Sequence, residues 1–260
     1  MKVKKVNLVY FSPNGTVYKT LKSISEEIGC ETKEYDLTPF NARWEKYSFS
    51  EDDLVILGMP VYSGRLPNIA AEFFRGIQGN RTPAVFVVLY GNRDYEDALL
   101  ELKNNAEQKG FVGIAAGAFI GEHSIDPQIG AGRPDSEDIK KAAAFGKQIK
   151  EKLENSNNLS TIQELKVKGN YPYAKMRDIP IAPSTNDNCD NCSVCIKSCP
   201  TLAINSANVK ETDNFRCILC FKCIRDCPKG ARYIDHDAFN EKVKLLKLIA
   251  ALRREPELFI

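Results

Sequence analysis

Residues 189–200 read CDNCSVCIKSCP and residues 217–228 read CILCFKCIRDCP, and this repeated stretch decides how the second half of the chain folds. Each run spaces its cysteines as C-x2-C-x2-C-x3-C and ends in proline. The two runs are 28 residues apart and hold eight of the nine cysteines. The match continues beyond the cysteines, since Lys197 corresponds to Arg225 and Ala203 to Ala231. The region is therefore an internal duplication.

This cysteine spacing is the one that bacterial proteins use to hold a pair of [4Fe–4S] clusters, in which the fourth cysteine of each run binds the other cluster. Gaps of two residues let a tight loop bring three thiolates to one face of a cluster, and the proline then turns the chain away. A zinc site favours two C-x2-C pairs with a longer spacer and needs no further cysteine. A disulfide framework needs an oxidising compartment. Two clusters explain the pattern better than either alternative.

Residues 187–235 resemble a bacterial two-cluster ferredoxin, which is a small α+β domain. The resemblance implies two [4Fe–4S] clusters as cofactors. The ligands then fall into two sets, with Cys189, Cys192, Cys195 and Cys227 for cluster I and Cys217, Cys220, Cys223 and Cys199 for cluster II.

The first 150 residues alternate apolar segments with helical patterns. Such alternation predicts an α/β domain with a doubly wound, five-stranded parallel sheet. Strands are expected at 2–11, 31–36, 54–57, 84–89 and 111–120, and helices at 17–28, 68–75, 95–108 and 136–153. The only tryptophan, Trp44, is expected in the core.

The loops after the first, third and fourth expected strands carry the residues of a ligand site. In an open α/β sheet the ligand lies outside the carboxyl ends of the strands. Residues 12–16 read SPNGT and offer hydroxyls, an amide and backbone N–H groups at a helix start, which together suit an anion. Tyr62 and Tyr95 stand in the other two loops and could stack on a planar ring.

Residues 1–154 resemble flavodoxin, and the stretches GMPVYSGRLP (58–67) and YGNRDYEDA (90–98) resemble the anaerobe family of flavodoxin–ferredoxin fusions, often called EFR1-type ferredoxins. The resemblance implies a flavodoxin-like fold with FMN. It places the phosphate at Ser12, Asn14, Gly15 and Thr16, and the ring near Pro60, Val61, Tyr62, Gly91, Asn92 and Tyr95. Flavodoxins usually carry Thr at the position of Asn14 and a hydroxyl residue at that of Val17, so weaker phosphate binding is expected.

His123 follows the fifth expected strand on the same rim of the sheet. Its pKa range suits a catalytic proton donor to reduced flavin, although it could equally be a structural loop residue. Arg65 and Arg93 could face the flavin or a substrate, or lie on the surface.

The domains are expected at 1–154 for FMN, 155–186 for a linker, 187–235 for the clusters and 236–260 for a helix that packs on the domains. The linker holds three prolines and lacks periodicity. The last helix is expected at 239–254, with Phe239, Val243, Leu246, Ile249 and Leu252 on its packed side.

The formal net charge of +2 leaves out the cofactors. Each oxidised cluster with its thiolates adds about −2, and a bound phosphate adds roughly −1.5 to −2. The loaded protein is therefore expected to be mildly acidic, which argues against nucleic acid as a partner. The apolar run at 6–11 is short for a signal peptide, and no stretch approaches the ~18 apolar residues of a membrane span. We expect a cytoplasmic protein with no membrane span.

Two functions fit these cofactors. The first is an electron-transfer protein that passes electrons between FMN and the clusters, to or from a redox protein partner. The second is an oxidoreductase, in which FMN reduces a small molecule with electrons from the clusters. Room for a ligand beside Arg65, Arg93 and His123 would favour the enzyme. A flavin edge covered by the cluster domain would favour the carrier.

Overall fold

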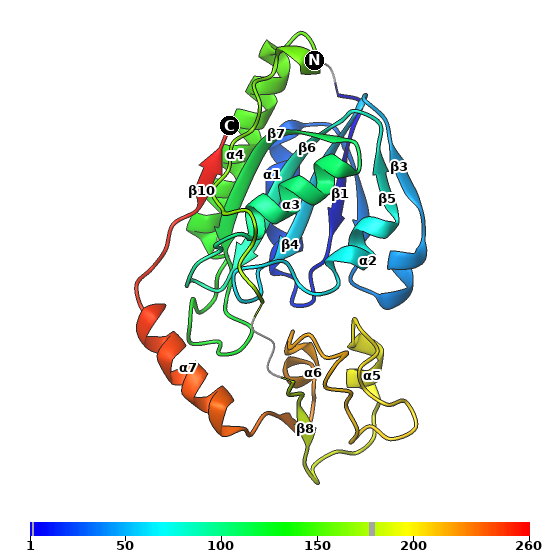
Figure 1. Cartoon of the computed structure of the whole chain (residues 1–260), viewed down its shortest axis with the longest axis vertical. Coiled ribbons are helices and arrows are strands. Elements are labelled where there is room, and N and C mark those ends of the chain that lie inside the picture. The colour runs from blue at the N-terminus through cyan, green and yellow to red at the C-terminus, as the bar shows by residue number, and fades with distance from the viewer. Residues whose placement is uncertain (2, 177–179) are drawn as a thin grey trace.

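The computed structural model describes residues 1, 3–176 and 180–260, and its largest part is a sheet in the order β10-β7-β6-β4-β1-β2 (Figure 1). Five of these strands run parallel: β1 (Lys5–Tyr10), β2 (Glu31–Asp36), β4 (Asp53–Pro60), β6 (Thr82–Tyr90) and β7 (Phe111–Ile120). Without β10, this is the 2-1-3-4-5 order of flavodoxin-like sheets. The expected fold class is confirmed.

Helices cover both faces of the sheet. One face packs against α1 (Thr16–Ile28) and α4 (Ser136–Asn155), and the other against α2 (Ala70–Arg75) and α3 (Ala98–Gln108). The central strands β4 and β6 are buried on both faces, which explains their continuous apolar runs. Two short strands, β3 (Tyr47–Phe49) and β5 (Ile77–Gly79), pair as a separate small sheet, and the 3₁₀ turn η1 spans Phe40–Trp44. We call residues 3–155 the first domain.

The segment after α4 runs back along the first domain. It contains the 3₁₀ turn η2 (Leu159–Thr161) and then no helix or strand among its described residues up to 183. Leu165 is buried in the core beside α3. The Asp97 carboxylate accepts the backbone N–H groups of Asn170 and Ala174, at 2.9 and 2.7 Å. The expected linker is thus held against the first domain over much of its length.

The cysteine-rich module, residues 184–233, lies beyond the carboxyl ends of the parallel strands (Figure 1). It contains β8 (Ser184–Thr185), α5 (Val194–Ser198), α6 (Lys222–Arg225) and β9 (Arg232–Tyr233), and β8 pairs with β9. The duplication is visible in the backbone, because three positions of each half have positive φ. These are Asn191, Ser193 and Leu202 in one half and Leu219, Phe221 and Gly230 in the other.

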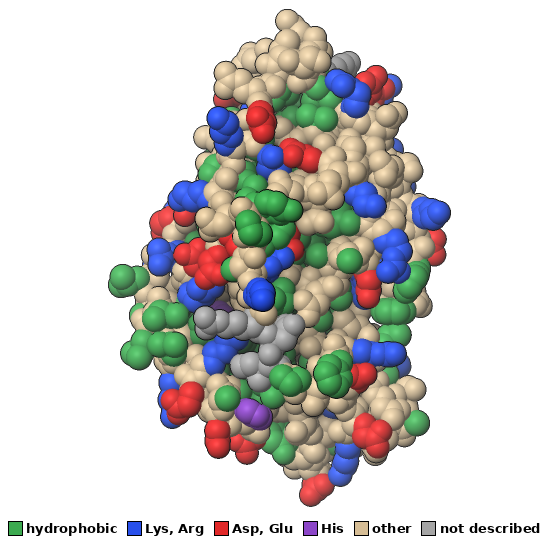
Figure 2. Space-filling model, in the orientation of Figure 1, with side chains coloured by type: hydrophobic (Ala, Val, Ile, Leu, Met, Phe, Trp, Pro, Cys, Tyr) green, Lys and Arg blue, Asp and Glu red, His purple; other side chains and the backbone are tan. Residues whose placement is uncertain are grey.

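The C-terminal strap, residues 237–259, leads from the module back to the sheet. It consists of α7 (Asp237–Ile249) and β10 (Glu257–Phe259), which adds antiparallel to the edge strand β7. The expected helix therefore ends five residues early, and the edge strand was not expected. Phe239 and Leu246 are buried, but Ile249 and Leu252 are exposed, and apolar side chains gather over α7 in Figure 2. No helix among the described residues is long and apolar enough to cross a membrane.

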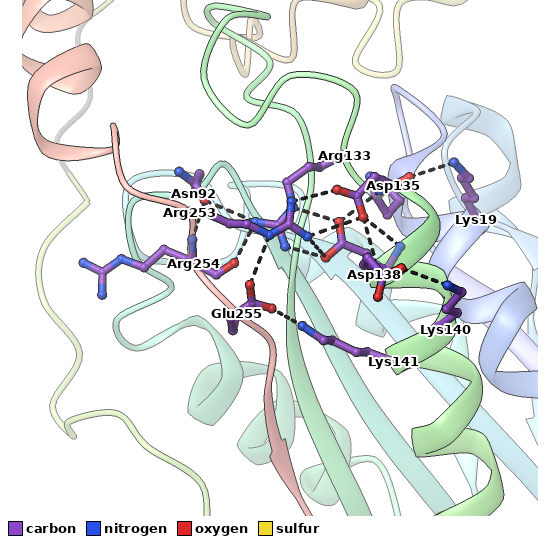
Figure 3. Close-up of polar contacts among 12 residues, drawn as sticks. Lys19, Asn92, Arg133, Asp135, Asp138, Lys140, Lys141, Arg253, Arg254 and Glu255 are labelled. Carbon is purple, nitrogen blue, oxygen red and sulfur yellow. Dashed lines mark hydrogen bonds and ion pairs between the residues drawn. The ribbon is translucent and has the colours of Figure 1, made fainter.

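Asn92 fixes the strap to the first domain (Figure 3). Its buried amide donates to the carbonyls of Ala250 and Leu252, at 2.7 and 2.9 Å. Its oxygen accepts the backbone N–H of Arg254 at 3.0 Å. Since its donors and acceptor are satisfied by backbone groups of the strap, Asn92 recognises an extended chain there.

Charged side chains reinforce this attachment (Figure 3). Arg133 is buried, pairs with Asp138 and donates to the Arg254 carbonyl at 2.7 Å. Arg253 donates to Asp135 at 2.7 Å, which holds the pKa of that carboxyl well below its usual range. The strap is therefore attached by both buried and exposed contacts.

We predict that Asn92→Ala loosens the strap. Loss of the three hydrogen bonds to the strap, together with one from Arg133, should cost about 2–4 kcal/mol of unfolding free energy. Hydrogen exchange should accelerate at the amides of β10. The control Asn105→Ala removes one bond inside α3 and should leave β10 unchanged. Unchanged exchange at β10 in Asn92→Ala would contradict this role.

Candidate functional site

A hollow opens at the carboxyl ends of β1, β4, β6 and β7, and we call it the sheet-edge hollow. Its volume is about 480 Å³ when the part open to solvent is included. Its lining comes from four loops and consists of Ser12, Pro13, Asn14, Thr16, Val17, Pro60, Val61, Tyr62, Leu89, Tyr90, Gly91, Gly121, Glu122, His123 and Ser124. Most of the residues expected around FMN are therefore brought together.

The loop before α1 has the form of an anion site. Gly15 stands just before the helix with φ +78°, a conformation that glycine adopts without strain. The first turn of α1 has no acidic side chain, and its N-cap residue Gly15 has no side chain to cap the helix. The Ser12 hydroxyl accepts the Tyr18 N–H at 3.1 Å, which folds the loop over the helix start. The first N–H groups of a helix lack partners within it, so this loop fits a phosphate.

Asn14 is turned toward the module. Its amide nitrogen donates to the carbonyl oxygen of Cys220 at 2.9 Å. The side chain that replaces the usual Thr of flavodoxins thus joins the first domain to a cysteine loop. Sequence reasoning placed Asn14 on the phosphate and missed this contact.

The ring side of the hollow is formed by the loops after β4 and β6. Burial raises the pKa of Tyr62 well above its usual value, so its phenol stays neutral. A Cβ on Gly91 would lie 2.4 Å from the His123 ring, so only glycine allows this close approach. Tyr90 also lines the hollow. Sequence reasoning missed Tyr90 and Glu122, although both stand at strand ends, the position that identified their neighbours.

The structure does not bring Asn92 and Tyr95 to the hollow. Asn92 binds the strap, and Tyr95 is buried with its hydroxyl donating to Glu257 at 3.0 Å. Burial and the Glu257 carboxylate raise the pKa of Tyr95. Tyr62 and Tyr90, rather than Tyr62 and Tyr95, are the two tyrosines at the hollow.

Neither arginine considered for the flavin or a substrate lines the hollow. Arg65 binds both oxygens of Glu101 at 2.8 Å and lies 4.7 Å from the Tyr173 ring centroid. Arg93 pairs with Glu96 at 2.6 Å. Both guanidinium groups are therefore engaged by side chains of the first domain and the adjoining segment.

His123 lines the hollow as a neutral imidazole. Burial lowers its pKa to about 4, helped by the positive charges of Lys242 and Arg93. Its Nδ1 accepts the Ile125 N–H at 3.2 Å, so the remaining proton lies on Nε2. At pH 7 the ring can donate a hydrogen bond, but it is seldom protonated and poorly suited to the expected role of proton donor.

The cysteines lie in two groups of four. Cys189, Cys192, Cys195 and Cys227 line one small hollow in the module, and they are the set expected for cluster I. The pKa values of Cys217, Cys220 and Cys223 are raised by burial and then by neighbouring thiolates, including that of Cys199. Cys199, Cys217, Cys220 and Cys223, the set expected for cluster II, are therefore close together.

The two groups share one local geometry. The Ala203 N–H donates to the Cys199 sulfur at 3.3 Å, and the Ala231 N–H to the Cys227 sulfur at 3.2 Å. No group of three or more His, Cys, Asp or Glu among the described residues is arranged around a single ion. Each thiolate of a [4Fe–4S] site binds a different iron, so the thiols need not converge on one point.

Arg232 places a buried positive charge between the two groups. It is 3% exposed, and its terminal nitrogens donate to Thr185, Val209 and Thr212 at 2.8–2.9 Å. Its Nε has no hydrogen-bond partner within the described part of the chain.

The charge of Arg232 reaches both cysteine groups. It opposes the effect of burial on the pKa values of Cys195 in the first group and of Cys217 and Cys223 in the second. A buried cation close to thiols of both groups fits negatively charged iron–sulfur clusters.

Comparison with known proteins agrees with this geometry. Residues 7–122 match the family model of the flavodoxin domain, and residues 183–228 match that of the 4Fe-4S dicluster domain. No curated protein matches the chain significantly.

Similar solved structures include several flavodoxins. One from the domain Archaea is 11% identical, covers 58% of this chain and 99% of its own, and has a TM-score of 0.40. A flavodoxin of Streptococcus pneumonia TIGR4 is 15% identical, with coverages of 58% and 97% and a TM-score of 0.39. The Megasphaera elsdenii flavodoxin is 16% identical, with coverages of 55% and 98% and a TM-score of 0.37.

We predict that His123 stays neutral until the pH falls to about 4. Because burial disfavours the charged ring, protonation is displaced below the usual range near 6.5. Histidine-labelled NMR of the oxidised protein measures this directly, with His123→Gln assigning the signal and exposed His236 giving the other. A midpoint for His123 above pH 6 would contradict the prediction.

We predict that Arg232→Gln lowers the reduction potential of at least one cluster by tens of millivolts, on the order of a single charge at an effective dielectric constant near 20. Removing the cation disfavours the more negative, reduced cluster. Arg232→Lys keeps the charge and should shift the potential less. Potentiometric titration followed by EPR gives the values. Equal potentials in wild type and Arg232→Gln, at full iron content, would exclude this effect.

Proposed function

We propose that this chain, which joins a flavodoxin domain to a 4Fe-4S dicluster domain in the order of a flavodoxin–ferredoxin fusion, carries electrons between FMN and two [4Fe–4S] clusters and exchanges them with a separate redox protein. The observation that carries the proposal is the direct contact of the sheet-edge hollow with a cysteine loop through Asn14 and Cys220. The two candidate cofactor sites therefore adjoin.

The residues of the hollow fit FMN. Ser12, Gly15 and Thr16 would hold the phosphate at the start of α1. Tyr62 and Gly91 belong to the two loops that would hold the ring. When bound, FMN exchanges one or two electrons, whereas each cluster exchanges one.

The eight cysteines would hold the clusters in the two groups described above. Burial raises the pKa values of the Cys220 and Cys223 thiols, so cluster formation must supply free energy to bind these two as thiolates. Arg232 would offset part of the charge, and the N–H groups of Ala203 and Ala231 would bind cluster sulfur ligands.

The contacts favour an electron carrier over a reductase of small molecules. The module lies against the open side of the hollow, where Arg225 pairs with Glu122 at 2.9 Å. Arg65 and Arg93, which would bind an anionic substrate, are engaged elsewhere. Neutral His123 is a poor proton source. The contacts that the hollow makes with the module, through Asn14 and Glu122, suit electron transfer between the two cofactor sites.

Cytoplasmic function is part of the proposal, because eight cluster ligands must stay reduced and out of disulfides. All nine cysteines are free thiols in the structure.

The test is anaerobic reconstitution with iron, sulfide and FMN, followed by photoreduction. We expect one FMN and about eight iron atoms per chain. Electron exchange between flavin and clusters should have a rate independent of protein concentration, because both lie on one chain. FMN should bind at least about tenfold more tightly than riboflavin, since only FMN uses the anion site. Failure to bind flavin, or exchange that accelerates with protein concentration, would disprove the proposal.

A further inference from the structure

We propose that the cluster held mainly by the second cysteine run exchanges electrons with the flavin, and that Asn14 and Arg225 position it by docking its loop on the sheet-edge hollow. The other cluster then faces the external partner. This inference rests on the proposed function and adds the order of the two clusters and the residues that set it.

Two side chains of the first domain bind the backbone beside ligands of the second group. Asn14 donates to the carbonyl of Cys220 at 2.9 Å. Arg43, which is fully buried, donates to the carbonyl of Pro200, the residue after Cys199. Cys220 and Cys199 both belong to the second group, so two separate loops of this cluster site are attached to the first domain.

Arg225 adds a charged contact from the end of α6. Its guanidinium pairs with Glu122 at 2.9 Å and donates to the carbonyl of His123 at 3.0 Å. Both partners line the sheet-edge hollow. Arg225, two residues after Cys223, therefore binds the rim of the sheet-edge hollow itself.

Apolar contacts complete the docking. Ile218 packs against the core cluster of the first domain that lies on the α2 and α3 face of the sheet. Phe221 and Leu219 share a cluster with Ile125 of the loop after β7 and with Phe239 of α7. Burial of these side chains favours the docked arrangement by the hydrophobic effect.

The duplication diverges at these docking positions. Ile218, Leu219 and Phe221 correspond, at the offset of 28, to Asp190, Asn191 and Ser193 of the first run. The backbone is equivalent in both halves, as the matching positive φ values show. The polar counterparts therefore mark the first run as the side that faces water.

The contacts of the first run also indicate that it faces water. Among the described residues, no hydrogen bond or ion pair joins residues 189–198 to the first domain. Cys192 is exposed, whereas its counterpart Cys220 is buried. A partner protein could approach the first group without displacing the flavin domain.

The position of the module on the first domain is also fixed by the chain segments before and after it. The linker, which precedes the module in the chain, is bound to Asp97, and the strap, which follows it, is bound to Asn92. With both connections attached to the first domain, the module is limited in how far it can swing, which favours one fixed order of clusters.

The test uses a matched pair of variants at equivalent positions of the two runs. Arg225→Ala removes a docking side chain, and Lys197→Ala removes the same charge from the exposed run. We expect Arg225→Ala to slow flavin–cluster exchange at least tenfold and to accelerate hydrogen exchange at residues 221–226. Lys197→Ala should change neither measurement. Equal effects of the two variants would overturn the inference.

Asn14 is tested separately because it lies beside the phosphate loop. Asn14→Thr supplies the residue usual in flavodoxins, so FMN affinity should hold or rise while hydrogen exchange in residues 217–223 accelerates and electron exchange slows. Asn14→Ala should give the same loosening. Unchanged hydrogen exchange in both variants would overturn the role of Asn14.

Measured iron and FMN contents distinguish a failure of the proposed function from a failure of the proposed order of clusters. Wild type that binds both cofactors but shows no intramolecular exchange disproves the proposed function. Wild type with fast exchange that none of the docking variants slows, at full cofactor content, disproves the order of clusters and leaves the function standing.

Discussion

The parallel direction of β1, β4, β6 and β7 is the constraint on which the rest of the structure depends. Parallel strands present all their carboxyl ends at one edge, so loops distant in sequence meet there. The phosphate loop, the tyrosine loops and the Glu122–His123 turn form the sheet-edge hollow for this reason. The same edge accepts the module. One geometric rule therefore places the sheet-edge hollow and the cysteine groups side by side.

The residues at this edge divide between two tasks. Some strand-end side chains line the hollow, while Asn92 and Tyr95 bind the strap instead. Polar groups buried at the edge need partners, and the backbone carbonyls of the returning chain supply them. The strap thus stabilises the edge and holds the module over it.

Much of the fold could be predicted from the sequence. The strands β4 and β6 are buried on both faces, which makes their apolar runs unmistakable, and the cysteine groups follow from spacing alone. The helix of the strap was predicted, but its attachment to the first domain was not, because Asn92 binds backbone carbonyls and these leave no sequence signal. Trp44, expected in the core, is 55% exposed because it lies on the surface against the Arg75 guanidinium. The large apolar side chain of Trp44 was therefore not enough to predict burial.

The side of the module that docks on the first domain can be read from the sequence only when the two cysteine runs are compared position by position. A duplicated ligand loop must keep the residues that hold its cluster, so its two copies can differ only where their surroundings differ. The ligand cysteines and the sulfur-binding Ala203 and Ala231 are the same in both copies, whereas Ile218 faces the first domain and Asp190 faces water. Differences in polarity between the two copies therefore mark the interface. In the order of clusters that we propose, the apolar copy is therefore the one that would meet the flavin.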